Sequence, residues 1–284
     1  MGTGGRQIMR VSFLGPAGTY AEAASLLYAP NANLVPARTF TAAAQAVEDG
    51  EADEAVCAIE NALEGPVAET LAILVRDELA LSIHAEIVLD IRHSLVGAPG
   101  LDLETVPVVY SHPQALAQCR RRLSELVPAA QPVAALSTAA AIEAAMAEPG
   151  TIAVGNQRAA ELYSAHCYAD DIADLPNNQT RFVVLARSEV EPTGDDKTSL
   201  VFTMAHDRPG SLVEVLQPFA ERSINMTKIE SRPTGQQLGT YFFFADVEGH
   251  QQEAAVAAAI AEARPHTQWL RVLGSYPRWT GHDA

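Results

Sequence analysis

The order of predicted strands and helices changes once along this chain of 284 residues, and the change divides it into two domains. In residues 10–187, short β-rich runs alternate with helical stretches, which is typical of a largely parallel α/β sheet. A hydrophilic segment, 187–197, follows and carries Pro192 and Gly194, residues typical of a linker. Beyond it the predicted order is strand, helix, strand, strand, helix, strand, which is the ferredoxin-like order.

Short apolar runs and apolar stripes locate the individual elements. In the first domain the predicted strands are residues 11–14, 55–59, 106–110, 132–136, 151–154 and 182–185. In the second domain the predicted strands are 199–204, 224–230, 240–247 and 268–273, and the helices are 211–222 and 252–263. Each of these two helices has a single apolar stripe, so each has one face for a sheet.

Composition and charge exclude several classes of protein. With 48% hydrophobic and 19% charged residues, the chain has an ordinary globular composition. Its net charge of -16 disfavours a nucleic-acid partner, because only Arg120-Arg121-Arg122 forms a basic run, which we interpret as a solvated helix face. Residues 1–10 contain no apolar segment of signal-peptide length, and no run approaches the ~20 residues of a membrane span. We therefore expect a cytoplasmic protein without a membrane partner.

The three cysteines indicate neither a disulfide framework nor a zinc site. Cys57, Cys119 and Cys167 are far apart and have no Cys or His neighbours at metal-ligand spacing. Cys119 shares a helical stripe with Leu116 and Leu123, which predicts a buried core thiol. No metal is expected.

Three strand-to-helix junctions place a hydroxyl residue at the predicted start of a helix. These residues are Thr19, Ser111 and Thr138, and the first two have Glu22 and Gln114 at capping-box spacing. Helix starts carry partial positive charge and unpaired N–H groups, so they can bind carboxylates or phosphates. Helix capping alone would explain each junction, but such ends gather at the carboxyl edge of a parallel sheet, where ligands usually bind.

Further polar residues stand next to predicted strands. Asn61 ends one strand, Gln118 lies one turn into the helix opened by Ser111, and Thr180-Arg181 precedes another strand. Neighbouring residues on a strand point to opposite faces, so Thr180 and Arg181 cannot both face one cleft if the strand has begun. A turn at Asn61, a solvated Gln118 and a surface ion pair at Arg181 remain open as alternatives.

Five motifs, each weak alone, occur in register along nearly the whole chain. They are Gly15-Pro16-Ala17-Gly18-Thr19, Ile59-Glu60-Asn61, Ser111-His112-Pro113-Gln114-Ala115-Leu116, Thr180-Arg181-Phe182 and Glu230-Ser231-Arg232-Pro233. Together they resemble the prephenate dehydratase family. The resemblance implies a catalytic domain, residues 8–188, with two α/β lobes like those of type 2 periplasmic binding proteins and an active site in the cleft. It implies a ferredoxin-like ACT regulatory domain in residues 197–278.

The resemblance also implies roles for individual residues, with Thr180 as the catalytic residue. The candidate substrate-binding residues, which include the helix starts, are Thr19, Asn61, Ser111, Gln118, Thr138, Arg181 and Phe182. The candidate phenylalanine-binding residues are Gly210, Ser211, Leu212, Val213, Asn225, Glu230, Ser231, Arg232 and Pro233.

The chain departs from the family pattern at three positions. Ser211 stands where the family segment Gly-Ala-Leu-Val has alanine, and we expect this change to alter effector affinity or preference. Ala62 and Ala21 stand where the family usually has hydroxyl residues. Those two hydroxyl contacts must therefore be dispensable or replaced.

The implied activity is conversion of prephenate to phenylpyruvate, with loss of water and carbon dioxide and without a cofactor. The enzyme would be a hydro-lyase of phenylalanine biosynthesis under feedback inhibition by phenylalanine. ACT domains usually pair side by side, so a homodimer or homotetramer is expected. Because no chorismate mutase segment precedes Val11, we expect a monofunctional enzyme. The donor of the proton to the departing hydroxyl is not identified.

Two alternatives remain open. The first is a non-catalytic amino-acid sensor that combines binding-protein lobes with an ACT domain; Ala62 and Ala21 favour it, whereas Thr180-Arg181-Phe182 argues against a dead site. The second is an enzyme that prefers arogenate, in which an amine replaces the pyruvyl keto group. A comparison of turnover of the two substrates distinguishes these possibilities.

Overall fold

A computed structural model describes residues 8–281 except 207, 236 and 238. Residues 1–7, part of the segment considered for a signal peptide, lie outside the described residues. The chain divides into two compact units, one formed by Met1–Leu71 and Ile87–Phe182, the other by Ala72–Glu86 and Val183–Ala284. Within the described ranges, no helix has the length and apolar character needed to cross a membrane.

The first sheet has the order β2-β1-β3-β11-β5, and its strands β1, β2 and β3 run parallel. The strands are β1 (Arg10–Leu14), β2 (Asn33–Ala37), β3 (Glu54–Asn61), β5 (Ser82–Asp90) and β11 (Gln179–Ala186), and the short β4 (Gly65–Pro66) pairs with β3. The helices in this part of the chain are α1 (Tyr20–Tyr28), α2 (Phe40–Glu48) and α3 (Ala68–Leu74). β2 and β5 were not predicted from the sequence.

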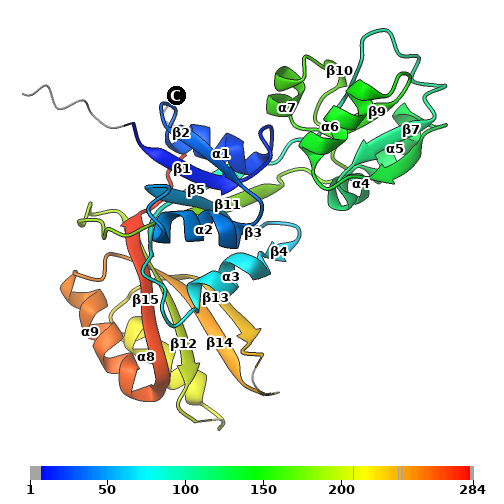
Figure 1. Ribbon diagram of the computed structural model, residues 1–284. Helices are drawn as coiled ribbons and strands as arrows, with labels where there is room; N and C mark the ends of the chain where they lie inside the picture. The colour runs from blue at the N-terminus through cyan, green and yellow to red at the C-terminus, as the bar shows by residue number, and fades with distance from the viewer. Residues whose placement is uncertain (1–7, 207, 236, 238, 282–284) are drawn as a thin grey trace, which may run out of the picture. The chain divides into compact units, whose positions relative to one another are not determined.

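The second sheet has the order β10-β6-β9-β7-β8 and mixes parallel and antiparallel pairs. Its strands are β6 (Ser94–Gly97), β7 (Val108–Ser111), β8 (Gln131–Ala134), β9 (Ile152–Gly155) and β10 (His166–Ala169). Its helices are α4 (Pro113–Gln118), α5 (Arg120–Leu126), α6 (Thr138–Ala147) and α7 (Gln157–Leu162). The chain enters this sheet after β5 and leaves it before β11 (Figure 1), so the expected two-lobed α/β architecture is confirmed.

The alanine-rich composition of this second lobe allows its helices to pack closely on its sheet. One face of its sheet packs on α6 and α7 through a core cluster that includes Ala139, Ala141, Ala153 and Ala159, all fully buried. Helix α6 packs closely on the sheet at Gly155, which has no side chain. A Cβ atom there would lie 2.4 Å from a methyl group of Ile142. The other face carries a cluster that contains Cys119, so the predicted core thiol is confirmed. The predicted strand at 132–136 ends at Ala134.

The second unit contains the predicted ferredoxin-like order. Its elements are β12 (Asp196–Met204), α8 (Ser211–Glu221), β13 (Met226–Pro233), β14 (Tyr241–Glu248), α9 (Ala254–Ala263), a 3-10 turn (Arg264–His266) and β15 (Thr267–Pro277). The antiparallel sheet has the order β13-β14-β12-β15, and α8 and α9 cover one face of it (Figure 1). Phe202 from the sheet and Phe219 from α8 belong to the core between these layers.

A segment distant in sequence, Ala72–Glu86, also belongs to the second unit. The Lys197 ammonium lies 2.8 Å from both carboxylate oxygens of Glu86, and this pair is almost completely buried. Separating the two groups while either stays buried would leave an uncompensated charge, so this contact disfavours other arrangements of the segment. No sequence pattern indicated this association.

Gly274 is the position at which the same segment approaches β15 most closely. A Cβ atom there would lie 2.2 Å from the carbonyl oxygen of Ile83, which is backbone and cannot rotate away. We expect Gly274→Ala to lower the free energy of unfolding by about 3 kcal/mol or more, because the two backbones must separate. Urea unfolding measures this loss. Gly150→Ala is the control: Gly150 has a φ of 84° but open space around it, so only the ~1–2 kcal/mol of a left-handed residue is expected. Equal losses at both positions would contradict the steric argument.

Candidate active site

A pocket of about 470 Å³ lies in the first unit and receives side chains from strands of the first sheet and from helices and loops of both lobes. It contains six of the eight predicted catalytic and substrate-binding residues: Thr19, Asn61, Gln118, Thr138, Thr180 and Phe182. Their elements are α1, β3, α4, α6 and β11. The remaining two, Ser111 and Arg181, do not line the pocket.

Thr19 caps α1 as its sequence position predicts. Its Oγ1 accepts a hydrogen bond from the Glu22 amide at 3.2 Å and donates to the Leu14 carbonyl at 2.9 Å. Glu22 accepts from the Gly18 amide at 2.6 Å. These reciprocal bonds fix the start of α1, which lines the pocket. The first N–H groups of a helix have no partner within the helix.

The predicted capping box at Ser111 is wrong, whereas the predicted helix start at Thr138 is confirmed. His112 is the N-cap residue of α4, and its Nδ1 accepts from the Gln114 amide at 3.3 Å. Ser111 is the last residue of β7, and its fully buried hydroxyl donates to the Val154 carbonyl at 2.7 Å. Thr138 is the first residue of α6, capped by the preceding serine, and it lines the pocket itself.

Arg181 faces away from the pocket because Thr180, its neighbour on β11, faces into it. The Arg181 Nε lies 2.6 Å from Glu60 Oε1, and Arg181 is only 7% exposed. The structure therefore has the ion pair that the sequence left as an alternative, although its Arg181 side chain is buried and only Glu60 is partly exposed. A role for Arg181 as a direct substrate ligand is not supported by this geometry.

The orientation of the Asn61 amide is determined by the turn that follows β3. Its Oδ1 accepts from the amides of Leu63 and Glu64 at 2.9 and 3.0 Å. Its Nδ2 therefore faces the other way and donates to Thr180 Oγ1 at 2.9 Å and to Asn178 Oδ1 at 2.8 Å. Because Thr180 Oγ1 accepts in this contact, its own proton remains for a ligand.

The hydrogen-bond network continues from Asn178 into the second lobe. Asn178 Nδ2 donates to Gln118 Oε1 at 3.1 Å, and His93 Nε2 lies 2.9 Å from the same oxygen. An amide oxygen only accepts, so His93 Nε2 carries a proton and donates. Gln118 Nε2 donates to Glu64 Oε1 at 3.0 Å, and the Tyr20 hydroxyl lies 3.2 Å from His93 Nδ1. Both lobes thus share one chain of oriented polar groups.

Four members of this network were not among the eight residues predicted for catalysis and substrate binding: Asn178, His93, Glu64 and Tyr20. Asn178 and Glu64 adjoin the family motifs at Thr180 and Asn61, so their position was a usable signal. His93 sits between β5 and β6, and it is 3% exposed. Neither the buried His93 nor Tyr20 carried a sequence pattern that separates a site residue from a core residue.

The described lining of this pocket includes no lysine or arginine, and Glu64 is its one carboxylate. Burial lowers the pKa of His93, although its hydrogen bond to Gln118 and the charge of Asp171 act in the opposite direction. Burial also lowers the pKa of His112, opposed by the charge of Glu64. Both imidazoles are therefore neutral near pH 7. An anionic ligand would meet neutral N–H and O–H donors and the positive ends of α1 and α6.

The predicted effector residues lie on separate elements of the second unit. Gly210, with a φ of 92°, is the N-cap residue of α8 and provides no side-chain cap. Ser211 is 7% exposed, and its hydroxyl has no hydrogen-bond partner among the described residues. Residues 230–233 are the last residues of β13. Asn225 lines a pocket of about 330 Å³ in the second unit, and none of the other predicted effector residues lines that pocket.

Comparison with known proteins identifies two family regions in the chain. The family model for prephenate dehydratase matches residues 11–190, and the model for the ACT domain matches residues 198–264. All the polar network residues described above lie within the first of these ranges. The second range covers the α/β sandwich from β12 to α9.

Relatives that are named as enzymes align over almost the whole chain. A prephenate dehydratase of Amycolatopsis methanolica is 40% identical, covering 97% of this chain and 90% of the relative. Arogenate dehydratase 5, chloroplastic, of Arabidopsis thaliana is 41% identical, covering 95% of this chain and 67% of the relative. The crystal structure of a prephenate dehydratase from Arthrobacter aurescens in complex with L-Phe has a TM-score of 0.87 at 38% identity, covering 95% of this chain and 90% of that one.

The lowered pKa of His93 predicts the pH dependence of stability. Folding disfavours its protonated form, so the stabilisation is complete above the unfolded pKa of about 6.5 and is lost as pH falls toward the folded value. We expect His93→Gln, which offers an N–H donor but does not titrate, to lose less stability between pH 7 and pH 5 in urea unfolding. His166→Gln, on the exposed part of β10, is the control and should follow the wild-type profile. Parallel pH profiles for His93→Gln and wild type would contradict a neutral His93.

Proposed function

The chain belongs to the prephenate dehydratase family, and we propose that it converts prephenate to phenylpyruvate. The hydrogen bond from Asn61 to Thr180 is the observation that carries this proposal most directly. It leaves the proton of the Thr180 hydroxyl available to a ligand, in a pocket whose other side-chain donors are neutral. The reaction needs such a donor because a hydroxyl group must leave the substrate ring.

The proposed reaction is a single elimination. The bond between the ring and its carboxylate breaks, the electron pair moves through the ring diene, and the bond to the ring hydroxyl breaks at the opposite carbon. The departing hydroxyl takes up one proton and leaves as water, and the carboxylate leaves as carbon dioxide. Aromatisation of the ring drives the process. Thr180 donates a hydrogen bond to the departing oxygen, while the net proton comes from solvent, because an alcohol is a weak acid.

The absence of cationic side chains from the described pocket lining supports the decarboxylation step. An arginine or lysine beside the ring carboxylate would stabilise its charge and oppose the loss of carbon dioxide. The starts of α1 and α6 can hold the pyruvyl carboxylate with N–H groups and partial charge. We propose that the ring carboxylate instead lies against uncharged groups, where its weaker solvation raises the free energy of the ground state.

Arogenate is the second candidate substrate, because one relative with 41% identity is named an arogenate dehydratase. Arogenate carries an ammonium group where prephenate has a keto oxygen. The Glu64 carboxylate is the group in the pocket lining that could attract this ammonium. The ratio of kcat/KM for the two substrates, measured with wild type and Glu64→Gln, decides between them.

Thr180→Val is expected to reduce turnover of prephenate by about 10²–10³-fold, since it preserves shape but removes a transition-state hydrogen bond. Thr180→Ser, which retains the hydroxyl, should keep most of the activity. Phenylpyruvate formation by the purified protein measures both. Thr41→Val is the matched control, because the Thr41 hydroxyl donates to Glu69 at an exposed site outside the pocket. Normal turnover in Thr180→Val would remove the proposed role.

We further propose that phenylalanine inhibits the enzyme through the ACT domain. The proposed domain limits are residues 8–188 for catalysis and 197–278 for regulation, and the proposed assembly is a cytoplasmic homodimer or homotetramer. The proposed effector residues are those at the start of α8 and the end of β13. Inhibition requires that phenylalanine bind one conformation of the enzyme better than another, and closure of the two catalytic lobes is the conformational variable we propose.

The hydroxyl of Ser211 provides a test of this regulation. A buried hydroxyl without a partner destabilises the free protein, so Ser211→Ala should raise its free energy of unfolding by about 1 kcal/mol or more. If phenylalanine satisfies the hydroxyl, the same change should reduce the increase in melting temperature that phenylalanine causes and weaken inhibition. Ser12→Ala is the control, since the Ser12 hydroxyl is buried but donates to Ala43 at 2.7 Å. An unchanged phenylalanine response in Ser211→Ala would contradict the contact.

A further inference from the structure

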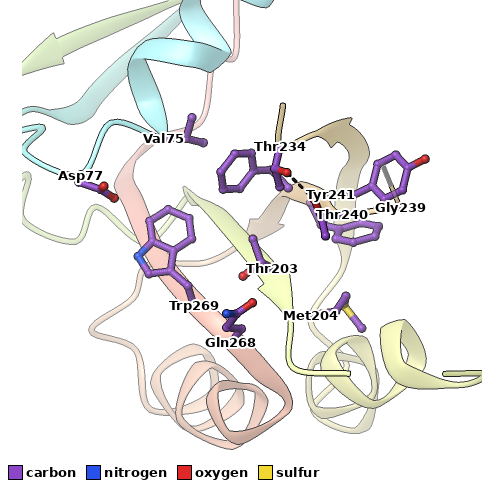
Figure 2. Close-up of a pocket in the computed structure, with 12 residues that line it drawn as sticks. Val75, Asp77, Thr203, Met204, Thr234, Gly239, Thr240, Tyr241, Gln268 and Trp269 are labelled. Atoms are coloured by element: carbon purple, nitrogen blue, oxygen red, sulfur yellow. Dashed lines mark hydrogen bonds between the residues drawn. The ribbon is translucent and has the colours of Figure 1, made fainter. Parts of the chain in front are cut away.

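A second pocket, of about 490 Å³, lies in the unit that contains the four-stranded sheet (Figure 2). Phe202 is buried in the core beneath α8 and α9, so its neighbour Thr203 points to the opposite face of the sheet. The strand register places Phe242 and Trp269 on either side of Thr203. These three side chains form one wall of the pocket, on the sheet face that the helices do not cover.

Trp269 is held in place by Arg271, which does not line the pocket, and by Phe242, which does. The Arg271 guanidinium lies 4.9 Å from the centre of the Trp269 ring, within the range of a cation–π interaction. Arg271 also donates to the carbonyl oxygens of Arg76 and Asp77 at 2.6 and 3.1 Å. The Phe242 ring meets Trp269 nearly edge-on, with centroids 5.9 Å apart. The aromatic wall is therefore preorganised before any ligand binds.

The segment 72–86 supplies the other wall through Val75 and Asp77. Asp77 is exposed and is the single charged side chain among the described lining residues. Its carboxylate has no ion-pair partner within the described part of the chain. Figure 2 shows this carboxylate on the same side of the sheet as the Trp269 indole. The other polar lining groups, such as those of Thr203 and Gln268, are neutral.

This pocket is distinct from both sites described above. None of its lining residues belongs to the catalytic pocket, and none belongs to the predicted effector set. Its volume is in the range of small-molecule sites, which combine aromatic walls with a few placed polar groups. A flat ring can pack against the surface that Trp269 and Phe242 form together, and a carboxylate at the edge of an aromatic wall favours a cation.

We propose that this pocket binds a small aromatic molecule that carries a protonated amine. The ligand ring packs against Trp269 and Phe242, and its ammonium group pairs with the Asp77 carboxylate. Because Asp77 belongs to the segment 72–86 and Trp269 to β15, the ligand would join the two parts of the second unit across the pocket. This site requires neither the proposed catalytic reaction nor the proposed phenylalanine site.

Trp269 gives the experiment a reporter inside the pocket. The chain has two tryptophans, so Trp279→Phe leaves Trp269 as the only source of tryptophan emission. Phenethylamine, which has the ring and the amine but no carboxylate, is titrated into this single-tryptophan protein, and 3-phenylpropanoate, which has the opposite charge, is titrated in parallel. We expect a saturable change of Trp269 emission with phenethylamine and much weaker binding of 3-phenylpropanoate.

The charge contact is tested by Asp77→Asn in the same background. Loss of one exposed ion pair is expected to weaken phenethylamine binding by about threefold, which corresponds to ~0.6 kcal/mol. Glu78→Gln is the matched control, because Glu78 is the next residue, is also exposed and does not line the pocket. Ser211→Ala separates this site from the effector site and should leave phenethylamine binding unchanged. Melting temperatures establish that each variant is folded.

Three outcomes would overturn the proposal. The first is an absence of saturable emission change with phenethylamine. The second is equal affinity in Asp77→Asn and in Glu78→Gln, which would show that the carboxylate takes no part. The third is Trp269 emission that varies with protein concentration and is insensitive to phenethylamine, which would mean that a second copy of the chain covers this face.

Discussion

The orientation of one amide side chain determines how the polar groups of the candidate active site are arranged. The turn after β3 provides two backbone N–H groups that only the Asn61 oxygen can accept, so the Asn61 nitrogen must face Thr180 and Asn178. Each following group then has one possible role: Asn178 accepts from Asn61 and donates to Gln118, and Gln118 donates to Glu64. The directions of donors and acceptors in the pocket thus follow from a backbone turn rather than from side-chain flexibility.

In the proposed function, an acidic protein must bind a ligand that carries two negative charges. The chain has a net charge of -16, and the described pocket lining offers no cationic side chain. Helix starts and neutral donors can still bind a carboxylate at short range, because local dipoles act over a few ångströms while the net charge is screened by salt. A site lining without cationic side chains also suits a reaction in which one carboxylate must lose its charge.

The second unit depends on a segment from the first half of the chain. Glu86 pairs with Lys197, and Gly274 lets the backbone of Ile83 approach β15 without a side chain between them. The family match for the ACT domain covers residues 198–264, which excludes both Ile83 and Gly274. This unit is therefore larger than its family region, and the additional segment forms one wall of the aromatic pocket at Trp269.

The sequence alone determined the ferredoxin-like order of the second unit, the two-lobed α/β class and the family, because periodicity and motifs are local properties of the chain. It also determined six residues that meet in the candidate active-site pocket, since motif positions carry over without geometry. Only the tertiary structure decided that Arg181 turns toward Glu60, that Ser111 bonds to Val154, and that His93 and Asn178 join the network. The physical reason is that strand alternation, burial and hydrogen-bond direction depend on partners distant in the chain, and no local pattern specifies those partners.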